Sequence, residues 1–222
     1  MFYRIENIPD EQTMQAVVAN LLPLVPFARR DKALRYKHLH GQYTCLRTWQ
    51  LLHSLLIEHA WLPADFPLAD LTYTEDAHGK PWLSIAPSHG KLSEGSSHDK
   101  PSVGSSPLYF SLSHTKTALA VAIARFPIGI DIETIISDRR LDQTFLNHTM
   151  SLAEQTAIRA AADPCLAFTE LWTRKEALFK ALGTGIEMAS LSSLLADPGS
   201  CTFLTAHADT YAYSIASLQA SL

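Results

Sequence analysis

The chain lacks any run of apolar residues that could cross a membrane. Its longest uninterrupted apolar run, Ala118–Ala124, is far shorter than the roughly 20 residues that a transmembrane helix needs. Near the N-terminus, Glu6 stands where a secretory signal peptide would have its apolar core. These two absences predict a cytoplasmic protein that is neither exported nor inserted into a membrane.

Positive charge and paired cysteines are also scarce. The chain has 18 lysines and arginines against 22 aspartates and glutamates, a net charge of −4. Because nucleic-acid-binding proteins usually carry a basic excess, we expect no nucleic-acid partner. The three cysteines, Cys45, Cys165 and Cys201, are odd in number and scattered, which predicts reduced thiols rather than a disulfide framework. The ten histidines form no HExxH zinc motif.

What the chain does have is the composition of a folded globular protein. Of its 222 residues, 47% are apolar and 18% are charged, which excludes intrinsic disorder as the dominant state. The length allows one domain or two small, closely packed ones.

Helical periodicity marks the longer segments. Apolar residues recur at helical spacing in Glu11–Leu22, Gln42–His59, Leu141–Ala162 and Ala167–Leu182. Asp10 precedes the first of these as an N-cap, and Gly183 follows the last as a C-cap signal.

Shorter segments have the pattern of strands: Leu71–Thr74, Pro81–Ala86, Leu108–His114, Thr117–Ala124, Ile128–Ile135, Cys201–Ala206 and Tyr211–Ala216. Pro87–Pro107, rich in Ser, Gly, His and Pro, predicts a long mobile surface loop at 87–107. Along the chain, a group of predicted helices is followed by a group of predicted strands, and this order occurs twice. We therefore predict an α+β fold with two similar α+β halves, residues 1–126 and 127–222.

Two carboxylates share one face of a predicted strand. In Gly129–Glu133, Asp131 and Glu133 are two residues apart and project to the same side, because side chains alternate along a strand. Adjacent carboxylates repel unless a cation lies between them, and Mg²⁺ prefers oxygen ligands. The alternative is an edge strand with a solvated acidic face.

A second pattern lies on the last predicted helix. Trp172, Glu176 and Lys180 fall at i, i+4 and i+8, so they form one stripe. A carboxylate and an ammonium beside an aromatic ring that favours burial indicate a partly desolvated site. The alternative is an ordinary helical Glu–Lys pair, which contributes only about 0.2–0.5 kcal/mol.

Hydroxyl, imidazole and cationic groups complete the set. Ser113 and His114 end a predicted strand but point to opposite faces, and no GxSxG elbow is present, so we interpret them as hydrogen-bond donors to a phosphate rather than as a nucleophile and its base. The most basic stretch, Arg29–Lys37, and Lys80 add cations. Cations together with three carboxylates suit a metal-bridged pyrophosphate substrate.

Four motifs now resemble one family. Gly79–Pro81 (GKP), Phe110–His114 (FSLSH), Gly129–Glu133 (GIDIE) and Trp172–Lys180 (WTRKEALFK) are similar, in order and spacing, to those of the Sfp-type 4′-phosphopantetheinyl transferases. The resemblance implies a pseudo-dimer of two α+β halves in one chain. It also implies transfer of phosphopantetheine from coenzyme A to a serine of an apo acyl or peptidyl carrier protein, with release of 3′,5′-ADP.

The resemblance assigns roles residue by residue. The matching Mg²⁺ ligands are Asp131, Glu133 and Glu176. The positions that match coenzyme A contacts are Arg29 and Lys32 for the 3′-phosphate, Lys80, Pro81, Ser113 and His114 for the phosphates and adenine pocket, and Lys175 and Lys180 near the pyrophosphate. We expect Lys180, together with Glu176 or Glu154, to act in catalysis.

Some expectations stay open at this point. Met150–Glu154 is similar to a family segment whose glutamate helps activate the serine, so the base is either Glu154 or Glu176. A Mg²⁺-dependent phosphohydrolase of pyrophosphate-containing nucleotides is the alternative enzyme, and a non-catalytic coenzyme A-binding module is a third interpretation. Two fused halves predict a monomer, and no feature indicates which carrier protein is served.

Overall fold

The computed structural model describes residues 1–76, 79–85, 106–137, 141–184, 191, 193–195 and 199–218. The chain divides into two compact units, the N-terminal unit Met1–Phe126 and the C-terminal unit Pro127–Leu222. Within the described ranges, no helix combines the length and the apolar character that crossing a membrane would require. The described residues of the two units together form six α-helices and two antiparallel sheets, which is an α+β fold.

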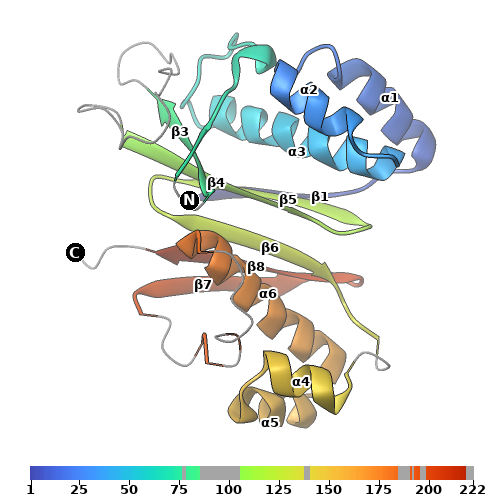
Figure 1. Cartoon of the computed structure of the whole chain (residues 1–222), viewed down its shortest axis with the longest axis vertical. Helices are drawn as coiled ribbons and strands as arrows, with labels where there is room; N and C mark the ends of the chain where they lie inside the picture. Colours follow the sequence, from blue (N-terminus) through green and yellow to red (C-terminus); the bar gives the residue numbers. More distant parts are fainter. Residues whose placement is uncertain are drawn as a thin grey trace. The chain divides into compact units, whose positions relative to one another are not determined.

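The N-terminal unit packs helices on one face of a sheet (Figure 1). Its antiparallel sheet has the strand order β1-β5-β4-β3-β2. The elements in chain order are β1 (Phe2–Asn7), α1 (Glu11–Leu21), α2 (Phe27–Leu34), α3 (Leu39–Glu58), a 3₁₀ turn (Leu68–Asp70), β2 (Thr74–Glu75), β3 (Pro81–Ile85), β4 (Ser106–His114) and β5 (Ala118–Ala124).

Helix α3 supplies much of the core of this unit. Its side chains Leu46, Trp49 and Leu52 are at most 1% exposed and belong to the same apolar cluster as Leu119 and Val121 of β5. Burying a leucine or valine side chain stabilises a fold by about 1.5–3 kcal/mol, so this layer is a main source of stability. The basic helix α2 packs against α3.

The C-terminal unit is built around one long helix. Its elements are β6 (Ile128–Thr134), α4 (Gln143–Thr149), α5 (Leu152–Ala160), α6 (Pro164–Leu182), β7 (Cys201–His207) and β8 (Tyr211–Leu218). The sheet is antiparallel in the order β6-β8-β7, and α6 packs against all three strands (Figure 1). Asp163 caps the start of α6, and Gly183 ends it in the left-handed conformation, with φ 76°.

Most elements expected from the sequence are present, with some differences. The strand expected at Leu71–Thr74 is wrong except at Thr74, which begins β2. Strand β1 and helix α2 were not predicted, and the helical segment 141–162 is two helices that separate at Met150 and Ser151. Ser106 and Pro107 belong to β4 rather than to the loop expected at 87–107, because β4 pairs with β3 at that end. The rest of the loop expected at 87–107 lies outside the described residues.

The two units share an order of pairing. In each, an initial strand precedes the helices and pairs antiparallel with the last strand, as β1 does with β5 and β6 with β8. The sheets differ in size, with five strands in one unit and three in the other as described. The similarity of the two halves therefore stays a prediction.

A close approach of β6 to α6 fixes the C-terminal unit. At Gly129 of β6, a Cβ atom would lie 2.5 Å from the backbone nitrogen of Ala181 and closer still to the carbonyl oxygen of Ala177. The partner strand also offers small residues here, since Gly129 pairs with Ala216 and Asp131 with Ser214. Only glycine allows the helix backbone to lie this near the strand.

We predict that Gly129→Ala lowers the free energy of unfolding by about 3 kcal/mol, the upper end of the usual overpacking cost, because backbone atoms cannot rotate away from the new methyl group. Chemical denaturation measures the change. Gly199→Ala is the control: its Cβ meets open space, and only its positive φ of 60° causes strain, so its cost should be about 1 kcal/mol. Equal costs for the two variants would contradict the close approach.

Candidate functional site

The β6 face that meets α6 carries the two carboxylates predicted to share it. Gly129, Asp131 and Glu133 alternate onto that face, and Asp131 is only 3% exposed. The Lys180 ammonium of α6 donates to Oδ1 of Asp131 at 2.7 Å and to the carbonyl oxygen of Ile130 at 3.2 Å. The strand carboxylate and the helix lysine are thus joined directly.

The charge of Asp131 acts on the protonation of both neighbouring glutamates, Glu133 and Glu176. Burial raises the pKa of Glu133 to about 7, and the charge of Asp131 adds to the rise, while Lys180 opposes it and Glu176 contributes least. Burial also raises the pKa of Glu176, again with help from Asp131 and against Lys180. Lys180 therefore opposes the pKa rise of both glutamates without cancelling it.

This carboxylate cluster, Asp131, Glu133 and Glu176, has the chemistry of a cation site but not a closed geometry. Among the residues that the structure describes, no three His, Cys, Asp or Glu side chains are grouped closely enough to hold a metal ion as they stand. Asp131 instead accepts from Lys180. The joint binding of one Mg²⁺ by all three carboxylates stays a prediction.

Neither alternative interpretation, a solvated acidic face or an ordinary helical Glu–Lys pair, agrees with the geometry of this cluster. A solvated acidic face requires exposed carboxylates, whereas Asp131 is buried and Glu133 is half-buried. An ordinary helical pair would join Glu176 to Lys180, but the ion pair of Lys180 crosses to Asp131 on the strand. Trp172, whose burial was expected, is partly buried, and its ring stacks with that of Phe168 at 6.2 Å between centroids.

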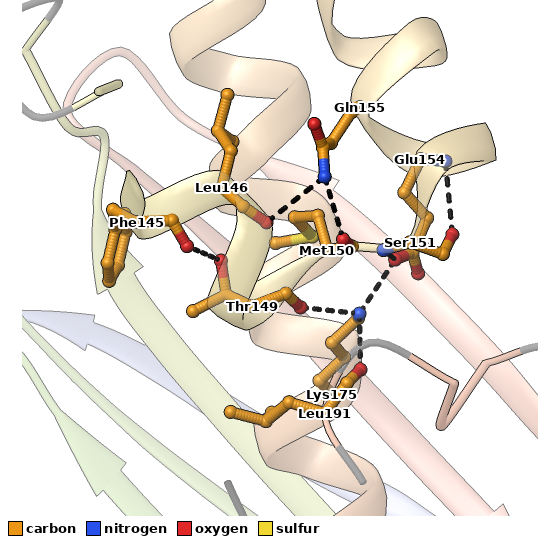
Figure 2. A network of polar contacts seen from close by, with 9 residues as sticks. All are labelled: Phe145, Leu146, Thr149, Met150, Ser151, Glu154, Gln155, Lys175 and Leu191. Atoms are coloured by element: carbon orange, nitrogen blue, oxygen red, sulfur yellow. Dashed lines mark hydrogen bonds and ion pairs between the residues drawn. The ribbon is translucent and has the colours of Figure 1, made fainter. Parts of the chain in front are cut away.

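Lys175 of α6 and Glu154 of α5, both predicted site residues, contact each other. Lys175 is fully buried, and its ammonium donates to Oε2 of Glu154 at 2.7 Å (Figure 2). Glu154 also closes the capping box of α5 with Ser151. The structure therefore does not place Lys175 beside the carboxylate cluster, and its predicted coenzyme A contact has no geometric support here.

In the N-terminal unit, two predicted cations line a cavity of about 180 Å³. The Arg29 guanidinium lies over the Trp49 ring at 4.1 Å and is 8% exposed, whereas Lys32 is exposed. The cavity is lined by Pro26, Ala28, Arg29, Lys32, Trp49, Leu71, Thr72 and Tyr73. Sequence reasoning missed the roles of Trp49 and Tyr73, because an aromatic residue at helical or strand spacing is usually core.

The other predicted groups of this unit lie on neighbouring strands. Lys80 and Pro81 are at the start of β3, while Ser113 and His114 end the antiparallel strand β4. Burial lowers the pKa of Lys80 to about 8, and Asp76 partly opposes that shift. None of these four residues lines the cavity of Arg29 and Lys32. The structure thus gives the N-terminal cations two locations.

Comparison with known proteins covers most of the chain. Residues 127–220 match the model of the 4′-phosphopantetheinyl transferase superfamily. The chain is 26% identical over 198 residues to the 4′-phosphopantetheinyl transferase psf-1 of Bacillus pumilus, a match that covers 87% of this chain and 73% of that protein. It is 23% identical over 187 residues to the 4′-phosphopantetheinyl transferase gsp of Aneurinibacillus migulanus, covering 84% and 66%.

A shorter match reaches a much larger protein. Over 66 residues the chain is 39% identical to the fatty acid synthase subunit alpha of Penicillium patulum, which covers 30% of this chain and 4% of that one. The superfamily match and the two bacterial relatives confirm the resemblance inferred from the four motifs.

We predict that Glu133→Gln raises the melting temperature at pH 8 but not at pH 5 when no divalent cation is present. The folded pKa of about 7 exceeds the ordinary 4.5, so the stability due to this group is complete below pH 4.5 and is lost as the pH rises through 7. Because Glu133 is partly exposed and screened, we expect a gain of about 2–4 °C, which corresponds to about 1 kcal/mol.

Thermal denaturation at the two pH values measures this effect. Glu11→Gln is the control, because Glu11 is exposed in the first turn of α1 and should change the melting temperature equally at both. A pH-independent effect of Glu133→Gln would show that this carboxylate is not desolvated.

Proposed function

Because the chain is a relative of the 4′-phosphopantetheinyl transferases, matched by their superfamily model over its C-terminal unit, we propose that it transfers 4′-phosphopantetheine from coenzyme A to a serine of an apo acyl or peptidyl carrier protein. One observation carries the proposal: the matched segment contains the buried cluster of carboxylates around Lys180. The Mg²⁺-dependent phosphohydrolase has no support from the relatives, which are transferases by name.

The proposed reaction replaces the phosphoanhydride bond of coenzyme A with a phosphodiester bond to serine. The serine oxygen forms a bond to the phosphorus that carries pantetheine, and the pyrophosphate bond of coenzyme A breaks to release 3′,5′-ADP. The serine proton passes to a base, and negative charge accumulates on the departing phosphate. Catalysis of this type depends on holding the phosphates in line and on offsetting that charge.

The C-terminal unit supplies groups suited to the pyrophosphate. The Lys180 ammonium, which is 31% exposed at its side chain, can reach both Asp131 and a solvent-side phosphate oxygen. The carboxylate oxygens of Asp131, Glu133 and Glu176 suit Mg²⁺, because a hard cation would favour the ionised form of Glu133, whose pKa is raised by burial and by the charge of Asp131. When bound there, Mg²⁺ would neutralise charge on the pyrophosphate.

The N-terminal unit supplies cations suited to the rest of coenzyme A. Arg29 and Lys32, which share the lining of one cavity, are proposed to bind the 3′-phosphate. Lys80, Pro81, Ser113 and His114, on the paired strands β3 and β4, are proposed to contact the other phosphates and the adenine. In this proposal the unit 1–126 binds the nucleotide end and the unit 127–222 carries the metal ligands.

The finer proposal for the fold is a pseudo-dimer of two fused α+β halves. It is supported by the shared order of pairing, in which the first strand of each unit joins its last. A chain that contains both halves needs no second copy to complete them, so we propose a cytoplasmic monomer. The alternative of a non-catalytic binding module differs in one respect: it predicts that coenzyme A binding does not weaken when Glu176 is altered.

We predict that Asp131→Asn and Glu176→Gln each slow carrier-protein modification by at least ~100-fold, which is the effect of removing one main electrostatic contributor. Glu176→Gln relieves repulsion by Asp131, so its metal-free melting temperature should stay level or rise slightly. Asp131→Asn also breaks the ion pair with Lys180, so its melting temperature should fall. Mass spectrometry of an apo carrier protein after incubation with coenzyme A and Mg²⁺ measures the rate.

Glu170→Gln on the same helix is the matched control, because Glu170 pairs with His207 away from the cluster. Its transfer rate should equal that of the wild type. Wild-type transfer by Glu176→Gln would remove this residue from the site, and a loss of transfer with a collapsed melting temperature would indicate a structural role instead.

We predict that Lys32→Ala weakens coenzyme A binding about tenfold but leaves dephospho-coenzyme A nearly unaffected, since a charge-assisted contact of about 1.4 kcal/mol is lost only with the 3′-phosphate. Calorimetric titration with both ligands tests this. Lys37→Ala, an exposed lysine beyond α2 and outside the cavity lining, is the control. Equal weakening for both ligands would separate Lys32 from the 3′-phosphate.

A further inference from the structure

Lys175 is a fully buried lysine in which each of the three ammonium hydrogens has an acceptor. Its ammonium donates to the carbonyl oxygen of Thr149 at 2.8 Å, to Oε2 of Glu154 at 2.7 Å and to the carbonyl oxygen of Leu191 at 2.6 Å (Figure 2). An ammonium has three donors, so these contacts use all of them. No donor remains for a substrate phosphate unless one of these contacts breaks.

The carboxylate of Glu154 is likewise occupied by contacts within the protein. Its Oε2 accepts from Lys175 and also from the backbone N–H of Ser151 at 2.7 Å, and the Ser151 hydroxyl accepts from the backbone N–H of Glu154 in return. The glutamate side chain is 14% exposed. Oε2 of Glu154 is thus occupied by a buried ammonium and a capping N–H, and both of these contacts are structural.

The acceptors of Lys175 come from three separate segments. Thr149 ends α4, Glu154 lies in the first turn of α5, and Leu191 follows α6 in the sequence. Gln155 of α5, which is 3% exposed, adds further contacts between α4 and α5 by donating to the carbonyl oxygens of Leu146 and Met150 (Figure 2). One ammonium on α6 therefore links this helix to the end of α4, to the start of α5 and to Leu191.

Lys175 precedes Glu176 on a helix that the sheet holds as well. Thr173, two residues earlier, shares a hydrogen bond of 2.8 Å with Ser214 of β8, and Gly129 of β6 touches the helix backbone at Ala177. Contacts with different segments at 173, 175 and 177 fix the rotation and the axial position of α6 at this point. The direction in which Glu176 projects depends on both.

We propose that the Glu154–Lys175 ion pair is a positioning pair, which sets Glu176 and Lys180 for transfer without touching coenzyme A or the serine. This inference rests on the proposed function. It assigns no base role to Glu154 and no phosphate contact to Lys175. Of the two glutamates considered for the base, it leaves Glu176.

A double-mutant cycle tests the pair with Glu154→Gln, Lys175→Met and the double variant. Removing one partner leaves the other charge buried and unpaired, whereas removing both leaves none. We expect each single variant to lose kcat and melting temperature while the KM for coenzyme A stays within about twofold of wild type. The double variant should regain melting temperature and transfer at least about tenfold faster than Lys175→Met alone.

The same double-mutant cycle also defines the result that would contradict the proposal. If the double variant regains its melting temperature but stays as inactive as the worse single variant, one of the two groups acts on the reactants and the proposal is wrong. A rise in KM for coenzyme A at unchanged kcat in Lys175→Met would likewise identify a ligand contact and overturn it.

The pH profile of Glu154→Gln gives a second readout, which does not need Lys175→Met to fold. Glutamine can still accept from the Ser151 N–H, so α5 keeps its cap. If Glu154 only positions, the acidic limb of kcat/KM keeps the wild-type midpoint; if Glu154 is the base, that limb disappears. Wild-type enzyme that modifies no carrier protein would refute the proposed function itself, whereas active wild type with an unrescued double variant refutes only this inference.

Discussion

The close approach of β6 to α6 at Gly129 is the constraint on which the C-terminal unit depends. Because no side chain separates strand from helix there, Lys180 comes within 2.7 Å of Asp131, and Glu133 and Glu176 share the same desolvated region. A larger residue would move the helix outward and lengthen every one of these contacts. The packing of one glycine thus sets the electrostatics of the candidate site.

Helix α6 carries two lysines whose environments separate their roles. Lys180 pairs with Asp131 yet keeps 31% of its side chain exposed, so it can exchange that contact for a ligand. Lys175 pairs with Glu154 with none of its side chain exposed, and its other donors are held by backbone carbonyls. Buried pairs of the second kind contribute geometry more than net stability, since desolvation offsets much of their attraction.

The sequence was sufficient to predict local features but not contacts between distant segments. Alternation along Gly129–Glu133 placed both carboxylates on one strand face, and the cap signals at Asp10 and Gly183 located helix ends. The pairing of Lys175 with Glu154 joins residues 21 apart, and no periodicity reports it. The capping box of Ser151 and Glu154 was the available signal, because it gives the carboxylate a structural partner before any catalytic one.

The most direct test of the central claim is a product balance with the wild-type protein. An apo carrier protein, coenzyme A and Mg²⁺ are incubated with the enzyme, and carrier mass and 3′,5′-ADP are measured together. Phosphopantetheinyl transfer predicts one 3′,5′-ADP released for each carrier molecule that gains phosphopantetheine, and neither product without the carrier. Cleavage of coenzyme A at the same rate without a carrier would contradict the claim.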